Sequence, residues 1–178
     1  MKKRRLLLLA LLPACLSLIS CSSPNTTPNK SSQGMVQESQ VGHDFQLQGV
    51  DGKTYTLSDF KGKKVYLKFW ASWCSICLST LEDTQELAKA ETNKDYVVLT
   101  VVSPDHQGEK SENDFKQWAE KLDTNHFPIL LDKEGRLLDQ YQVRAYPTQL
   151  FFDKTGRLVK SQVGFMDKDM IQETLDKL

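Results

Sequence analysis

The sequence predicts a single α/β domain with a central mixed sheet and helices on both faces. Residues 96–102 are a near-continuous run of β-branched and apolar residues, which is typical of a strand buried on both faces of a sheet. Residues 65–70 are also strand-like, and a pattern with helical spacing separates the two runs. Strands that alternate with helices in this way pair in parallel. Candidate hairpins near both ends of the domain add antiparallel strands.

Local patterns place these elements in order along the chain. Residues 45–57 alternate apolar and polar positions around Asp51-Gly52, which predicts an opening hairpin. Apolar residues at helical spacing predict helices over 75–91 and 111–122. The second half is expected to contain a strand over 127–131, a short helix over 136–141, hairpin strands over 148–152 and 157–163, and a closing helix over 167–178 capped by Asp167.

Residues 1–20 read as an export signal. Four basic residues precede an apolar run, Leu6 to Ile19, that is shorter than the roughly 20 residues needed to span a bilayer. Leu18-Ile19-Ser20-Cys21 resembles a bacterial lipobox, which implies cleavage before Cys21, lipid on its sulfur and an extracytoplasmic place on the cell membrane. An ordinary secretory signal that is cut elsewhere is the alternative.

Residues 21–42 are expected to form a lipid-anchored disordered tether, because they are rich in Ser, Thr, Asn, Pro and Gln and offer little apolar surface. Residues 43–178 suit one domain with one core. Loss of the signal removes four basic residues and no acidic ones, so 23 basic and 23 acidic residues become 19 and 23. This net negative charge argues against nucleic-acid binding.

Cys74 and Cys77 are the two cysteines that remain as thiols in the mature chain. A structural zinc site needs four ligands, and the histidines are scattered, so no metal is expected. Covalent haem attachment requires a histidine directly after the second cysteine, where Leu78 stands. A permanent staple is an alternative, but a bridge across so small a loop restricts the unfolded chain little.

A redox pair fits the expected local geometry better. Cys74 falls where the strand over 65–70 gives way to the helix over 75–91. Unpaired N–H groups and the positive end of the helix dipole stabilise a thiolate at such a position. We expect Cys74 to be exposed and to attack, and Cys77, about one turn deeper, to resolve.

Two segments resemble the active site of thioredoxin-fold oxidoreductases. Residues 69–77, FWASWCSIC, are similar to the dithiol segment, and Tyr146-Pro147-Thr148 is similar to the cis-proline loop. The resemblance covers residues 43–178 and implies a thioredoxin-like fold with an N-terminal β-hairpin extension. It also implies a cis bond before Pro147 and a redox-active Cys74–Cys77 disulfide with no other cofactor. The residues expected to contact a partner are Trp73, Ser75, Ile76, Tyr146 and Pro147.

Finer features narrow this resemblance. The hairpin and residues 57–63 are typical of the TlpA/ResA-like, membrane-anchored branch. Residues 69–74 and 103–122 resemble the thioredoxin-like domain that supplies electrons to methionine sulfoxide reductases in PilB-type proteins. These likenesses imply an extracytoplasmic methionine sulfoxide reductase as electron acceptor and a CcdA/DsbD-type membrane protein as electron donor. ResA-like reduction of apocytochrome c dithiols is the alternative.

Three positions depart from the family pattern. Lys68 stands where thioredoxin has a buried aspartate, and we expect it to favour a thiolate electrostatically or to pair with Glu82, unless it reaches solvent. Thr80 and Ile76 replace a glutamate and a proline that are common in TlpA/ResA relatives. Because no charge or histidine lies between the cysteines, we expect a reductant with a potential nearer thioredoxin than DsbA.

Two other classes share parts of these patterns. Peroxiredoxins also contain the hairpin and the sequence of residues 59–63, but their signature places Pro and Thr ahead of the attacking cysteine, where residues 70–73 read WASW. SCO-like copper carriers need cysteines one residue further apart and a distal histidine, for which His126 is the candidate.

Overall fold

The computed structural model describes residues 44–178, apart from 92–93 and 123–125. The expected signal peptide, the tether and Cys21 lie outside the described residues. In the part of the chain that is described, no helix has the length and apolar character to cross a membrane. The elements are, in chain order, β1 (Gln46–Gly49), β2 (Thr54–Thr56), the 3₁₀ helix η1 (Leu57–Phe60), β3 (Lys64–Phe69), α1 (Ser75–Ser79), α2 (Leu81–Ala90), β4 (Tyr96–Val102), α3 (Glu112–Ala119), β5 (Ile129–Leu131), α4 (Arg136–Gln140), β6 (Thr148–Phe152), β7 (Leu158–Val163) and α5 (Lys168–Asp176).

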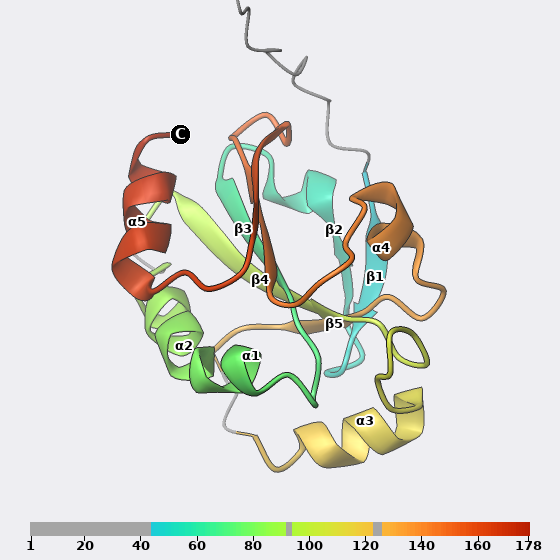
Figure 1. The fold of residues 1–178 in the computed structure, drawn as a ribbon. Coiled ribbons are helices and arrows are strands. Elements are labelled where there is room, and N and C mark those ends of the chain that lie inside the picture. Colours follow the sequence, from blue (N-terminus) through green and yellow to red (C-terminus); the bar gives the residue numbers. More distant parts are fainter. Residues whose placement is uncertain (1–43, 92–93, 123–125) are drawn as a thin grey trace, which may run out of the picture. The chain divides into compact units, whose positions relative to one another are not determined.

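Within the described residues, seven strands form one mixed sheet in the order β2, β1, β5, β4, β3, β6 and β7. The three strands β3, β4 and β5 run parallel to one another. The hairpin β6–β7 adds antiparallel strands beside β3, and the hairpin β1–β2 adds them beside β5 (Figure 1). The predicted mixed sheet with a hairpin at each end is therefore confirmed.

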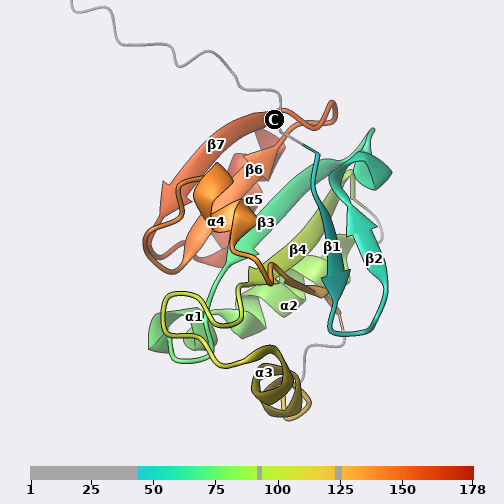
Figure 2. The same cartoon turned by 90° about the vertical axis from the view of Figure 1, so that its right-hand side faces the viewer.

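Alternation of side chains along the central strands produces one apolar core on each face of the sheet. Leu67 and Phe69 of β3 face a core that α4 covers. Tyr66 and Trp70 face a second core, to which α2, α3 and α5 contribute. Figure 2 shows α4 in front of the sheet and α2 and α5 behind it. Because Lys68 shares the parity of Tyr66 and Trp70, its side chain enters the second core.

The single helix expected over 75–91 is divided into α1 and α2 at Thr80. The hydroxyl of Thr80 lies 3.1 Å from the carbonyl oxygen of Ile76 and 3.0 Å from that of Cys77, and it donates to these last carbonyls of α1. Threonine hydroxyls that bond back to the preceding turn bend helices. The sequence pattern missed this break because apolar spacing continues across it.

Other boundaries differ from the prediction by a few residues. β5 begins at Ile129 rather than at residue 127, since Pro128 has no N–H to donate to a neighbouring strand. α3 ends at Ala119 rather than at residue 122. The predicted cap of the closing helix is confirmed, because the Asp167 side chain accepts a hydrogen bond from the N–H of Met170 at 2.8 Å.

Candidate active site

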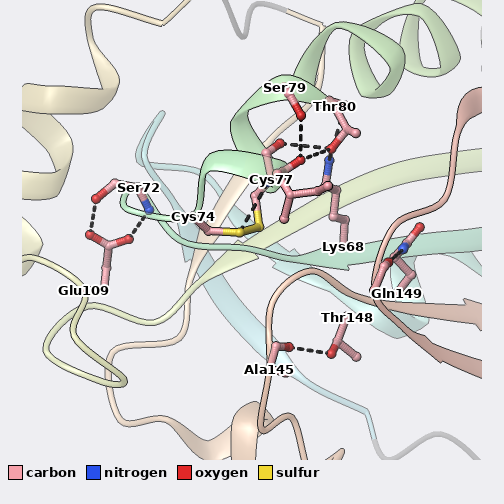
Figure 3. Close-up of a disulfide and its surroundings, with 12 residues drawn as sticks. Lys68, Ser72, Cys74, Cys77, Ser79, Thr80, Glu109, Ala145, Thr148 and Gln149 are labelled. Carbon is pink, nitrogen blue, oxygen red and sulfur yellow. Dashed lines mark hydrogen bonds between the residues drawn. A yellow bond between two sulfur atoms is a disulfide. The ribbon is translucent and has the colours of Figure 1, made fainter.

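The two cysteines lie where the carboxyl end of β3 turns into α1 (Figure 3). Cys74 is the N-cap of α1, and its Sγ accepts a hydrogen bond from the N–H of Cys77 at 3.3 Å. The sulfurs are joined in a disulfide with an S–S distance of 2.02 Å. This is the strand-to-helix junction that the sequence predicts, and the same N–H can donate to a Cys74 thiolate after reduction.

The disulfide is less exposed than we expected from the sequence. Cys74 is 5% exposed and Cys77 is 0% exposed. Both belong to the core that contains Trp70, and Tyr146 packs against the same core. The expectation of an exposed Cys74 is therefore wrong for the oxidised protein. Cys74 is nevertheless the more accessible of the two cysteines, which agrees with an attacking role.

Large side chains around the disulfide are left open to solvent. Trp73 is 53% exposed and Ile76 is 45% exposed. The Trp73 ring lies 5.8 Å from the ring of Tyr146, centroid to centroid, and Ser75 is also exposed. Burial, and then Glu109 and Asp132, raise the pKa of Tyr146 to about 12, so its phenol stays uncharged at neutral pH. The side chains of Trp73, Ile76 and Tyr146 form an apolar rim beside Cys74.

The bond between Tyr146 and Pro147 is cis, as the resemblance implies. The carbonyl of Pro147 accepts a hydrogen bond from the N–H of Gly164 at 2.8 Å, and the Thr148 hydroxyl donates to the carbonyl of Ala145 at 2.7 Å (Figure 3). These bonds hold the loop at the start of β6. Pro147 is buried, whereas Tyr146 is partly open to solvent.

Lys68 is buried beneath α1 and α2 and is only 2% exposed. Its Nζ donates to Thr80 Oγ1 at 2.8 Å, to the Thr80 carbonyl at 3.3 Å and to Thr84 Oγ1 at 3.0 Å. Burial lowers the pKa of Lys68 to about 8, although the negative charge of Asp83 acts in the opposite direction. The three acceptors are neutral and match the three N–H groups of an ammonium.

Among the arrangements that we expected for Lys68 were a pair with Glu82 and a side chain that reaches solvent, and the described residues show neither. Among the described ion pairs, none joins Lys68 to Glu82, and the side chain does not reach solvent. The carboxylate that acts on it electrostatically is Asp83. Thr80 and Thr84 lie four residues apart, on the same face at the start of α2, and both meet Lys68 there.

Glu109 is a site residue that our sequence reasoning missed. This glutamate is 7% exposed, and its carboxylate accepts hydrogen bonds from the Ser72 N–H at 2.5 Å, the Ser72 hydroxyl at 2.6 Å and the Lys110 N–H at 2.7 Å. The Lys110 ammonium also donates to the Ser72 hydroxyl at 3.0 Å. Glu109 therefore holds the backbone two residues before Cys74.

The loop that carries Glu109 is also tied to the segment before the cis-proline. Gln107 Nε2 donates to the carbonyl of Val143 at 2.8 Å, and the backbone turns through positive φ at Asp105, Gln107 and Gly108. The one feature of the sequence that pointed to this loop was the resemblance of residues 103–122 to the PilB-type domain. That resemblance could not show that Glu109 contacts Ser72.

The candidate copper ligand is not brought to the cysteines. His126 lines a cavity of about 390 Å³ with Asp51, Lys53 and Tyr55, at the turn of the β1–β2 hairpin. Across residues 44–178, with the gaps noted above, no group of three or more His, Cys, Asp or Glu side chains could hold a metal ion. The donor set for an SCO-like copper site is therefore not assembled by the described residues.

Residues 39–161 match the model of the AhpC/TSA family. The thiol-disulfide oxidoreductase ResA of Geobacillus thermodenitrificans strain NG80-2 is 31% identical over 135 residues, which are 76% of this chain and 74% of that protein.

Solved structures give similar matches. The pneumococcal exposed lipoprotein thioredoxin Etrx1 from Streptococcus pneumoniae strain TIGR4 is 65% identical, with a TM-score of 0.74 over 76% of this chain and 100% of that chain. The N-terminal domain of PilB from Neisseria gonorrhoeae is 26% identical, with a TM-score of 0.63 over 69% of this chain and 82% of that chain. These matches confirm the fold class predicted from the sequence.

Proposed function

This chain belongs to the AhpC/TSA family and is a ResA-type thiol-disulfide oxidoreductase, and we propose that it acts outside the cytoplasm as a lipid-anchored reductant. The electron acceptor that we propose is a methionine sulfoxide reductase. The observation that carries the proposal is the Cys74–Cys77 disulfide, set at the start of α1 beside an open apolar rim.

The reaction transfers two electrons to the partner. The Cys74 thiolate attacks the partner's disulfide, so a mixed disulfide forms and one partner sulfur leaves as a thiolate. The Cys77 thiolate then attacks Cys74 Sγ, which forms the intramolecular disulfide and releases the second partner sulfur as a thiolate. The partner is reduced, and this protein is oxidised to the state that the structure shows. A CcdA/DsbD-type membrane dithiol would return it to the dithiol.

The surface around the disulfide suits an extended partner segment. Among the described residues, the backbone N–H and C=O of Tyr146 make no hydrogen bond. An extended strand could pair with this free backbone, as in other β-addition complexes. Trp73 and Ile76 would add apolar contact on either side of Cys74.

Two likenesses support the proposed acceptor over others. The chain is similar to the N-terminal domain of PilB, and residues 103–122 carry the resemblance to the domain that feeds methionine sulfoxide reductases. In the structure this segment contributes Glu109 to the site, so the likeness includes residues next to the dithiol. Similarity to ResA supports an apocytochrome dithiol as the second candidate.

Trapping of the mixed disulfide tests the acceptor. The Cys77→Ser variant cannot resolve, so Cys74 should hold the partner covalently until a reductant is added. The matched control is the double variant Cys74→Ser/Cys77→Ser, which should capture nothing. Capture of a methionine sulfoxide reductase is the expected result. Capture of an apocytochrome would overturn the acceptor and leave the dithiol chemistry intact.

Equilibration with glutathione tests the direction of electron flow. A reductant should have a potential near that of thioredoxin, about −270 mV, whereas DsbA-type oxidants lie near −120 mV. A measured potential above about −150 mV would reverse the proposed direction.

The lipid anchor is supported by the lipobox-like residues 18–21 and by similarity to a protein described as an exposed lipoprotein. Mass spectrometry of the mature N-terminus should find a diacylglycerol thioether on Cys21. The Cys21→Ser variant should leave the membrane fraction. An unmodified Cys21 in the wild-type protein would overturn this part of the proposal.

A further inference from the structure

Two buried residues of opposite charge flank the disulfide. Figure 3 shows Glu109 on the side of Cys74 and Lys68 on the side of Cys77. Glu109 is bound to Ser72, two residues before Cys74. Lys68 is bound to Thr80, whose hydroxyl in turn donates to the carbonyl of Cys77. Neither residue belongs to the dithiol motif, and the electron-transfer steps above use neither.

The side chain of Glu109 is surrounded by hydrogen-bond donors. Its two oxygens accept from two backbone N–H groups and one hydroxyl. Donors of this kind around both oxygens stabilise a carboxylate anion. The charged or titratable groups that face it are Lys110, through the Ser72 hydroxyl, and Tyr146. Lys110 is partly open to solvent, so it screens the negative charge of Glu109 incompletely.

Lys68 lies in the opposite situation. Its Nζ is surrounded by neutral acceptors from Thr80 and Thr84, and the described ion pairs give it no carboxylate partner. The charged or titratable groups near it are Asp83 and Tyr66. The negative charge of Asp83 acts electrostatically on both Lys68 and Tyr66. A cation held this way lacks a close counter-ion in the oxidised protein. Reduction of the disulfide introduces a negative charge into the same buried region, because a cysteine thiolate is an anion.

We propose that Glu109 and Lys68 set the reduction potential of the Cys74–Cys77 pair in opposite directions. Reduction takes up two electrons and two protons, or one proton fewer when Cys74 remains a thiolate. The fixed negative charge of Glu109 disfavours that thiolate and so favours the disulfide. The positive charge of Lys68 stabilises a thiolate and so favours the dithiol. Stabilising the reduced form of a dithiol makes the protein more oxidising.

The low dielectric constant of the site gives these charges their effect. A charge acts more strongly on a neighbouring titrating group where water is excluded than it does at the protein surface. Both residues are less than one-tenth exposed, and the cysteines between them are buried as well. The inference rests on the dithiol chemistry of the proposed function and is independent of which partner receives the electrons.

The test compares Glu109→Gln and Lys68→Met in the purified full chain, equilibrated with reduced and oxidised glutathione. Glu109→Gln should shift the equilibrium toward the dithiol by about three- to tenfold, and Lys68→Met should shift it toward the disulfide by a similar factor. A tenfold change corresponds to about 30 mV. The double variant should lie close to the wild-type protein. Glu120→Gln and Lys121→Met, which change exposed charges, are matched controls and should not shift it.

Alkylation of Cys74 as a function of pH gives a second readout. The midpoint pH should fall in Glu109→Gln and rise in Lys68→Met. Shifts in the same direction, or shifts no larger than those of the controls, would overturn the proposal. Because Glu109→Gln also disturbs hydrogen bonds, Ser72→Ala separates the two effects: it removes the bonds that the hydroxyl makes to Glu109 and to Lys110, and it keeps the carboxylate. A shift in Ser72→Ala as large as in Glu109→Gln would show that geometry, and not charge, is responsible.

Discussion

At the scale of single residues, Lys68 lies beside the redox-active disulfide, and the burial of its charge destabilises the folded protein. Burial lowers its pKa from 10.5 to about 8. Between these two pH values the unfolded chain holds a proton that the folded protein releases. Stability rises with pH wherever the unfolded state binds more protons, so the contribution of Lys68 is unfavourable below pH 8 and is relieved as pH rises toward 10.5.

Replacement of Lys68 by methionine should therefore stabilise the oxidised protein at pH 7. The gain is at most about 3 kcal/mol, and the loss of three hydrogen bonds to threonine reduces it. Urea unfolding at pH 7 and pH 10 measures the difference, which should shrink at the higher pH. Lys121→Met is the control. A difference that does not depend on pH would mean that Lys68 titrates alike in both states.

At the scale of elements, the break at Thr80 connects helix geometry to the site. Its hydroxyl accepts from Lys68 and donates to carbonyls at the end of α1. In a continuous helix over 75–91, backbone N–H groups would satisfy the carbonyls of Ile76 and Cys77, and the Thr80 hydroxyl would not be needed there. The break therefore lets one threonine serve both the helix end and the buried ammonium.

Thr80→Val keeps the shape of the side chain and removes the hydroxyl. We expect a loss of about 1–3 kcal/mol in the free energy of unfolding, because a buried ammonium loses an acceptor. Ser79→Ala is the matched control, since that hydroxyl also donates to the Ile76 carbonyl but is exposed. Urea unfolding of the two oxidised variants provides the comparison. Equal losses would indicate that the contact with Lys68 contributes nothing to stability.

At the scale of the whole molecule, the two cores share one sheet and should unfold together. Leu150 of β6 is buried in the core under α4, whereas Trp70 lies in the core on the other face. Leu150→Ala should lower the free energy of unfolding by about 2–5 kcal/mol. Val159→Ala, at a position that is 39% exposed, should change it by less than about 0.5 kcal/mol.

Two probes measured in the same titrations check this cooperativity. Tryptophan fluorescence includes Trp70 on one face, and far-ultraviolet circular dichroism follows the whole sheet and its helices. The two transitions should coincide in the wild-type protein and in Leu150→Ala. Separate transitions would show that the two faces of the sheet unfold independently.

Much of the fold follows from local patterns in the sequence. The run over 96–102 and the hairpin strand over 148–152 match β4 and β6 because alternation and β-branched residues act over adjacent positions. The cap at Asp167 and the position of Cys74 at the start of a helix are equally local. Resemblance supplied the cis bond before Pro147, which composition alone does not indicate.

The sequence by itself determined the mixed α/β sheet, the two end hairpins and the dithiol at a strand-to-helix junction. Only the tertiary structure decided what surrounds that dithiol. Glu109 is 37 residues from Ser72 in the chain, and Lys68 meets Thr84 from 16 residues away. Short-range patterns carry no information about such pairs, because their contact depends on how β3, α2 and the loop before α3 pack together. The buried charges beside the cysteines are therefore a property of the folded protein.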